Sequence, residues 1–169
     1  IYDWYWYDNR PFLENCLNDG FLKARNNKDM KFCLMWANHD ATHLWDKRNS
    51  DHDLSTVIWS GIVTPEIFSN ICDRTIEKYF RCENYYMIDG CPVYMIFDID
   101  NFIRSFGTSD ECRKGIDKFR RKTVEAGFDG LHFQVVHWRN RVFNWLDDSD
   151  SNKGVDSAEM YRFLGVDSV

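Results

Sequence analysis

The stretch "KFCLMWANHDATHLWDK", residues 31–47, carries the pattern that decides the fold. Residues 30–37 are nearly all apolar, as in a strand that is buried on both faces of a parallel sheet. The run passes directly into Asn38-His39-Asp40, where polar side chains replace side chains that pack. A buried strand followed at once by polar groups is typical of α/β proteins, whose functional residues follow the strands.

Strand-like and helix-like patterns alternate along the rest of the chain. Residues 91–98 (CPVYMIFD) form a second buried strand, Thr64-Pro65 is a helix start, and Thr108 with Glu111 makes a capping box. Repetition at about 30 to 45 residues predicts βα units and a parallel sheet. We expect strands over residues 2–7, 30–37, 55–63, 91–98, 130–137 and beginning at 166–169, helices over 12–27, 65–80, 108–127 and 156–164, and a short helix or loop over 141–146.

Composition excludes several classes of function. The 169 residues suffice for one domain, and a net charge of -6 without a basic cluster argues against a nucleic-acid partner. No apolar run reaches the roughly 18 residues that span a bilayer, and no signal peptide is visible. Six scattered cysteines without a C-x-x-C pair predict reduced thiols in a cytoplasmic protein.

Two short motifs have metal-binding counterparts. His39 and His43 share the spacing of the zinc motif H-E-x-x-H, but that motif requires a helix, whereas these residues directly follow a predicted strand. Asp98 and Asp100 match the D-x-D signature of many glycosyltransferases, which holds a divalent cation. The alternatives are a substrate-contacting loop at His39–His43 and a polar strand end with Asp100 capping a turn.

A third motif, residues 148–159, lines up with the EF-hand calcium loop at Asp148, Asp150, Asn152 and Glu159. The sixth position requires glycine, and the sequence has Lys153 there. Asp156 and Glu159 also fit an ordinary helix cap. A solvated acidic loop is therefore favoured over a calcium site.

Side chains that suit a saccharide recur at the predicted strand ends. Indole faces pack on the C–H faces of pyranoses, and carboxylate and amide groups bond to sugar hydroxyls. The alternative is that some of these rings belong to the core. The candidate substrate-binding residues are Trp4, Tyr5, Trp6, Trp36, Asn38, Asp40, Trp45, Asp98, Gln134 and His137, with Trp138 beside them, and Asp40 and Asp98 are the candidate catalytic residues.

Four segments carry a family resemblance: residues 2–14, 31–46, 85–103 and 164–169. In order and spacing they resemble the WbsX-type glycosyltransferases, also described as glycoside hydrolase family 99-like proteins. The resemblance implies a TIM-type (β/α)8 barrel that assembles or cleaves bacterial surface polysaccharide such as O-antigen. The matched positions Trp6, Trp36, Asn38, Trp45 and Asp98 would line the sugar cleft.

The chain departs from that family in two respects. Many relatives read W-A-N-E-N-W where this sequence reads Trp36 to Ala41 as W-A-N-H-D-A. A full barrel also needs about 250 residues. In family 99 enzymes the catalytic carboxylates belong to a later segment of N-E-W type, and this sequence has no match to that segment. We therefore expect a partial barrel over residues 1–169, either a fragment of a longer protein or a truncated relative whose open sheet edge is covered by another copy.

Three functions are compatible with these features. The first is a carbohydrate-active enzyme, a glycosyltransferase or glycoside hydrolase that uses a saccharide or nucleotide-sugar. The second is a non-catalytic sugar-binding or assembly module, because glycoside hydrolysis needs two carboxylates and few stand at strand ends. The third is a metal-dependent hydrolase.

Overall fold

Four parallel strands form the centre of the main sheet, as the sequence predicts. The structure is a computed structural model that describes residues 1–43, 55–138, 140–142 and 154–169. Trp4, Trp36, Ile96 and Val135 stand in one register row across the four strands. The strands are β1 (Tyr2–Tyr7), β3 (Leu34–Trp36), β7 (Cys91–Ile96) and β8 (His132–Val135), with β2 (Arg10–Phe12) antiparallel to β1 and β6 (Met87–Ile88) antiparallel to β7.

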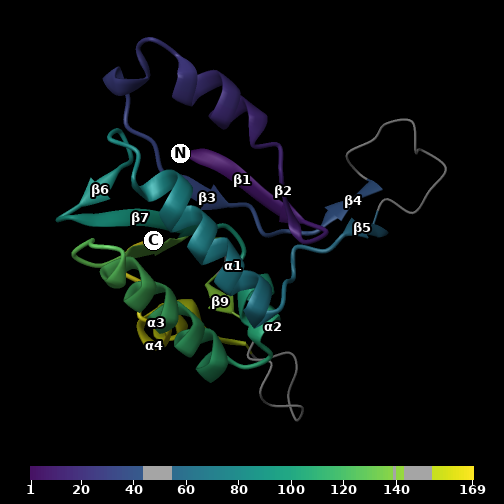
Figure 1. The fold of residues 1–169 in the computed structure, drawn as a ribbon. Coiled ribbons are helices and arrows are strands. Elements are labelled where there is room, and N and C mark those ends of the chain that lie inside the picture. The colour runs from purple at the N-terminus through teal and green to yellow at the C-terminus, as the bar shows by residue number, and fades with distance from the viewer. Residues whose placement is uncertain (44–54, 139, 143–153) are drawn as a thin grey trace.

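One face of this sheet is an aromatic core beneath the helices. The ring of Trp36 stacks on Phe68 at 6.1 Å, and Tyr94 meets Phe119 edge-on at 5.2 Å. The helices α1 and α3 lie side by side over this face (Figure 1). The helices are α1 (Pro65–Thr75), which continues as a π-helical turn (Ile76–Phe80), α2 (Ile99–Phe106), α3 (Ser109–Glu125) and α4 (Ser157–Leu164).

The predicted helix starts are confirmed. Thr64 Oγ1 accepts a hydrogen bond from the amide of Ile67 at 3.2 Å, and Thr108 Oγ1 accepts one from Glu111 at 3.1 Å. The helix α2 was not anticipated, because its start lies directly after a strand. Its cap is Asp98 rather than Asp100: Asp98 Oδ1 accepts from the amide of Asn101 at 3.0 Å.

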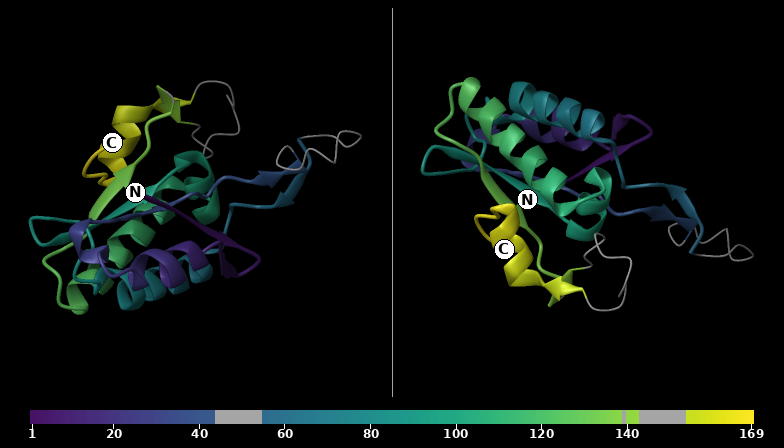
Figure 2. Two further views of the ribbon diagram at one scale, coloured as in Figure 1. Left: turned by 90° about the horizontal axis from the view of Figure 1, so that it is seen from above. Right: turned by 90° about the horizontal axis from the view of Figure 1, so that it is seen from below.

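Three local predictions differ from the structure. Residues 12–27 form no continuous α-helix but a π-helical turn (Cys16–Gly20) and a 3₁₀ turn (Phe21–Lys23), with another 3₁₀ turn at Asn27–Asp29. A strand is present at β5 (Val57–Trp59), but it pairs antiparallel with β4 (Ala41–Thr42) in an arm outside the main sheet (Figure 2). Residues 141–142 form β9 (Arg141–Val142), which pairs with β10 (Val155–Asp156).

The free edge of β8 is met by the end of the described chain. Gln134 and Ser168 form a parallel bridge, and the amide of Val135 donates to Ser168 O at 3.2 Å. This contact confirms strand-like pairing within residues 166–169. The result is a mixed α/β fold with a curled, mostly parallel sheet that has the form of half a barrel. None of the described helices is long and apolar enough to cross a membrane.

Candidate functional site

The segments that follow the four parallel strands meet at one edge of the sheet. They are residues 8–9, 37–40, 97–98 and 136–138. Functional groups of open α/β sheets gather at this carboxyl edge. Backbone hydrogen bonds continue the pairing past the strand ends: Ala37 N to Trp4 O at 2.8 Å, Phe97 N to Trp36 O at 3.0 Å, and Val136 N to Ile96 O at 2.9 Å.

Asn38 joins two of these segments from a fully buried position. Its Nδ2 donates to Asp98 O at 2.6 Å, and its Oδ1 accepts from Asp98 N at 2.7 Å. The Nδ2 of Asn101 donates to Asn38 O at 3.1 Å. Because the amide is sealed from solvent and bonded to the backbone, Asn38 positions Asp98 and does not reach a ligand directly.

A row of aromatic rings crosses the carboxyl edge. Centroids of consecutive rings lie 4.5 to 6.1 Å apart. The indoles at the two ends are the exposed ones, Trp59 at 41% and Trp138 at 58%. Exposed rings of this kind offer flat apolar faces to a ligand. The aromatic row consists, in order, of Trp59, Tyr7, Tyr5, His39, Phe97 and Trp138.

Trp138 is held as a rigid platform although it is exposed. Its Nε1 donates to Phe97 O at 2.8 Å, and its ring meets the Phe97 ring edge-on at 4.5 Å. A pocket of about 250 Å³ opens beside it. This Trp138 pocket is lined by Phe97, Asp98, Ile99, Asp100, Val136, Trp138, Arg141, Val142 and Tyr161.

Two carboxylates, the phenol of Tyr161 and the guanidinium of Arg141 give the Trp138 pocket its polar groups. Asp98 and Asp100 both line it, and Asp98 is fixed by its cap on α2. Burial, and then the negative charge of Asp100, raise the pKa of Tyr161. Tyr161 therefore stays protonated at neutral pH, and its hydroxyl lies 3.4 Å from His137 Nδ1. The pocket thus combines acceptors with a hydroxyl, the groups that bind sugar hydroxyls.

The residues of the two metal motifs belong to no larger ligand cluster in the described ranges. No group of three or more His, Cys, Asp and Glu side chains that could hold an ion occurs among residues 1–43, 55–138, 140–142 and 154–169. Residues 39–43 include strand β4, so His39 and His43 do not share a helix face.

The structure places Trp4 and Trp36 in the core. Both indoles have 0% exposure, and Trp36 is enclosed by Phe68 and Phe102 of the helices. The expectation that these two rings face a saccharide is corrected, since neither has surface that a ligand could touch. In β1, side chains alternate between the two faces, so Trp4 and Trp6 point away from the row that contains Tyr5 and Tyr7.

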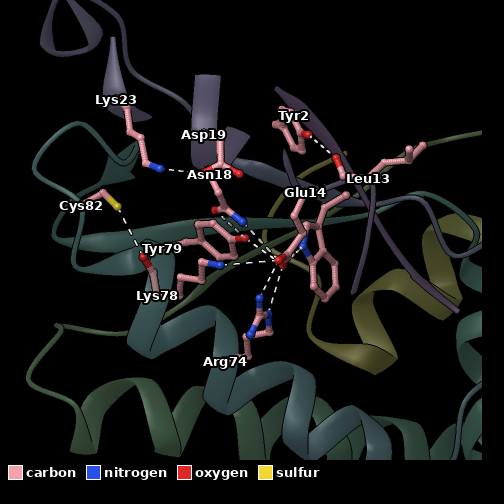
Figure 3. A network of polar contacts seen from close by, with 11 residues as sticks. Tyr2, Leu13, Glu14, Asn18, Asp19, Lys23, Arg74, Lys78, Tyr79 and Cys82 are labelled. Atoms are coloured by element: carbon pink, nitrogen blue, oxygen red, sulfur yellow. Dashed lines mark hydrogen bonds and ion pairs between the residues drawn. The ribbon is translucent and has the colours of Figure 1, made fainter. Parts of the chain in front are cut away.

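The indole of Trp4 instead bonds to Glu14. Figure 3 shows the polar groups that gather around this carboxylate. Trp4 Nε1 donates to Glu14 Oε1 at 2.9 Å, Tyr79 donates to the same oxygen at 2.8 Å, and Arg74 binds both carboxylate oxygens. Asn18 Nδ2 and Lys78 Nζ reach Glu14 Oε2 at 3.2 and 3.5 Å. We call these six residues the Glu14 cluster.

The donors determine the ionisation of Glu14. Burial opposes its ionised form, but the hydrogen bonds from Arg74, Trp4 and Tyr79 outweigh burial and lower its pKa to about 2. The same carboxylate raises the pKa of Arg74. A carboxylate that stays ionised and is saturated with donors is unsuited to general acid–base work. The Glu14 cluster is therefore a structural joint between residues 4–18 and α1.

The other candidate residues occupy different parts of the edge. Tyr5 is half-buried within the aromatic row, and Trp6 is 8% exposed at a separate pocket. Asp40 Oδ1 accepts from Gly61 N at 2.7 Å and Ser60 Oγ at 3.2 Å, so it ties the turn after β3 to the arm. A Cβ at Gly61 would lie 2.2 Å from Asn38 O, which explains the glycine.

Gln134 lies within β8, and His137 follows it. Gln134 is half-buried and bridges to Ser168, near the middle of the strand rather than at its end. His137 Nε2 lies 3.4 Å from Asn140 Oδ1, next to the Trp138 pocket without lining it.

Several residues of interest lie outside the described ranges. They are Trp45 and the three calcium-loop candidates Asp148, Asp150 and Asn152. Glu159 is described, and its amide donates to the capping Asp156 Oδ1 at 3.2 Å. The helix-cap interpretation of Asp156 is thereby confirmed.

The sequence did not identify Tyr7, Phe97, Trp59 or Tyr161 as site residues. The alternation of β1 could have placed Tyr7 on the face of Tyr5. Phe97 directly follows β7, a position like that of Asn38 after β3. For Trp59 and Tyr161 no local signal exists, because both come to the edge from elements outside the central strands.

The whole of this architecture falls within one family. The sequence profile described as Glycosyltransferase WbsX matches residues 1–162 of the 169. The chain belongs to the WbsX glycosyltransferase family. No curated protein and no solved structure matches the chain. Membership assigns the chain to a family of carbohydrate-active enzymes.

Proposed function

We propose that this WbsX-family chain binds a saccharide or nucleotide-sugar in the Trp138 pocket and takes part in glycosyl transfer. The observation that carries the proposal is the Trp138 platform beside Asp98. The ring is 58% exposed yet held by its bond to Phe97 O, with a carboxylate fixed next to it. Stacking on the indole orients the pyranose, and carboxylates accept hydrogen bonds from its hydroxyls.

Asp98 is the proposed catalytic residue, acting as a base on an acceptor hydroxyl. Two features of the fold favour it. The buried side chain of Asn38 bonds to both the N–H and the C=O of Asp98, and Oδ1 of Asp98 accepts the amide of Asn101. Asp40, the other candidate, bonds to Gly61 and Ser60 and is absent from the residues that line the Trp138 pocket. Gln134 and His137 remain proposed outer contacts.

The finer assignments rest on the family and on the topology. The parallel order of the four strands, with Ser168 paired on β8, supports a TIM-type barrel. A bacterial surface polysaccharide such as O-antigen is the proposed product. All six cysteines are free, which supports a reducing, cytoplasmic location.

A second function is a sugar-binding or assembly module without turnover. It is favoured because the donors around Glu14 exclude that carboxylate from acid–base work, and because Asp98 Oδ1 already accepts the amide of Asn101. Cleavage of a glycoside usually needs two carboxylates that flank the scissile bond.

Asp98→Asn separates the two functions. Asparagine caps a helix as well as aspartate does, so the fold is expected to persist. If Asp98 is the base, transfer or hydrolysis by purified protein should fall by about 100-fold or more, while saccharide binding persists. The matched control is Asp110→Asn, an exposed carboxylate in the first turn of α3. Binding without turnover in the parent protein would favour the module, and full turnover in Asp98→Asn would reject Asp98 as the base.

A further inference from the structure

A second pocket lies at the other end of the aromatic row. It has a volume of about 290 Å³ and lies where the β1–β2 turn, β5 and the segment before α1 meet. Trp59 belongs both to the row and to this pocket, since its ring stacks on Tyr7 at 5.8 Å. The β5 pocket is lined by Trp6, Asp8, Asn9, Ile58, Trp59, Ser60, Ile62, Val63 and Ile67.

The polar groups of the β5 pocket come from a constrained turn. Asp8 and Asn9 have φ values of 51° and 57°, the left-handed conformation of a two-residue hairpin turn. Aspartate and asparagine tolerate this conformation better than most residues. The turn is thereby fixed by the pairing of β1 with β2, and its two short polar side chains border the pocket.

Trp6 also lines the same pocket. It is 8% exposed and its Nε1 is sealed from solvent, so the polar contacts of a ligand here fall to Asp8, Asn9 and Ser60.

The aromatic row connects the two pockets. Between its exposed ends lie Tyr7, which is 5% exposed and packs against Trp59, and Tyr5, His39 and Phe97, which are half-buried. The edge from β1 to β8 contains three strand spacings, or about 14 Å, which is about the length of three pyranose units. Both ends offer an exposed indole with carboxylate and hydroxyl groups beside it: Asp98 and Tyr161 at one end, Asp8 and Ser60 at the other.

We propose that the site extends along the whole aromatic row, so that its substrate is an oligosaccharide chain that contacts both pockets. The Trp138 pocket holds the reacting sugar. The β5 pocket holds another sugar unit of the same oligosaccharide, several units away. This inference rests on the proposed saccharide site and adds the length of the substrate. A free monosaccharide or an isolated nucleotide-sugar would fill only one of the two ends.

A glycan array that carries mono- to hexasaccharides tests the proposal with the full chain as it exists. Retention should increase from disaccharides to tetrasaccharides within a homologous series. Trp59→Ala should weaken the binding of tetra- and hexasaccharides by about 3- to 10-fold and leave the binding of mono- and disaccharides unchanged. Trp138→Ala should weaken every length. Tyr86→Ala, which removes an exposed ring outside the row, is the matched control and should change none.

A second variant keeps the test decisive if Trp59→Ala fails to fold. Asn9→Gly retains the positive φ of the turn and removes only the amide, so it should weaken the longer glycans alone, by about 2- to 3-fold. If saccharides of every length are retained equally, and Trp138→Ala abolishes this retention, the extended site is overturned while the proposed function stands. Retention of no saccharide at all would overturn both.

Discussion

The Glu14 cluster and the Trp138 pocket are built from the same two groups, a carboxylate and an indole. In the cluster, Trp4 donates its N–H to Glu14 and both are buried. At the pocket, Trp138 donates its N–H to the backbone at Phe97, which leaves its face open beside Asp98. The comparison teaches that residue type alone does not separate structure from function. What separates them is whether neighbouring groups already satisfy the polar atoms and cover the ring.

The largest expected effect is the loss of the Glu14 carboxylate. Glu14→Ala leaves Arg74, Lys78 and Tyr79 without their shared acceptor, and it should lower the free energy of unfolding by about 3 to 5 kcal/mol. Chemical denaturation measures this loss. Asp19→Ala, which removes the exposed ion pair with Lys23, serves as control and should cost no more than about 0.5 kcal/mol. If the two variants lose equal amounts of unfolding free energy, the Glu14 cluster does not stabilise the fold.

The pH dependence of stability isolates the charge of Glu14. Its pKa is about 2 in the folded chain against an ordinary 4.5, so the stabilisation is complete above pH 4.5 and is lost as the pH falls through 2. The loss over this window should be about 3 kcal/mol. Denaturation of the parent chain and of Glu14→Gln at pH 6, 4 and 3 measures it. The difference between the two proteins should shrink as the pH falls, and a constant difference would contradict the ionised state.

Asn38 combines features of the Glu14 cluster and of the Trp138 pocket, because it is fully buried yet adjoins the site. A substitution there tests whether a buried residue can also support binding. Asn38→Ala removes both bonds to the Asp98 backbone and should cost about 2 kcal/mol of unfolding free energy. Because Asp98 then loses its support, saccharide binding should weaken as well. Isothermal titration alongside thermal unfolding reads both quantities. Unchanged binding in a destabilised variant would show that Asn38 does not position the site.

The smallest effect on stability is expected at Trp138. Its ring is exposed and is held by one hydrogen bond and one ring contact, so Trp138→Ala should lower the unfolding free energy by only about 1 kcal/mol. Saccharide binding should nevertheless fall by about tenfold, since the platform is lost. A large loss of stability would assign Trp138 to the fold instead of the site.

The sequence predicted the parts of the fold that depend on local patterns. The apolar runs at residues 30–37 and 91–98 gave β3 and β7, and Thr64 and Thr108 marked two helix starts. It failed where pairing partners are distant. Residues 57–59 resemble a strand of the main sheet, yet they pair with residues 41–42 in the arm.

The candidate site was predictable only in part, for the same reason. Alternation along β1 shows that Trp4 and Tyr5 face opposite sides, but it cannot show which side the helices cover. The helices cover the side of Trp4, and Tyr5 lies in the aromatic row. Asp98 was identified correctly as a residue of the carboxyl edge, since a polar group directly after a buried strand has few other positions.

The most direct test follows the indole N–H signals by ¹H–¹⁵N NMR during titration with the oligosaccharide that the array retains best. If the open edge is the binding surface, the signal of Trp138 should shift, and those of the buried Trp4 and Trp36 should stay in place. Shifts at Trp4 or Trp36 with Trp138 unmoved would contradict the assignment of core and site made here.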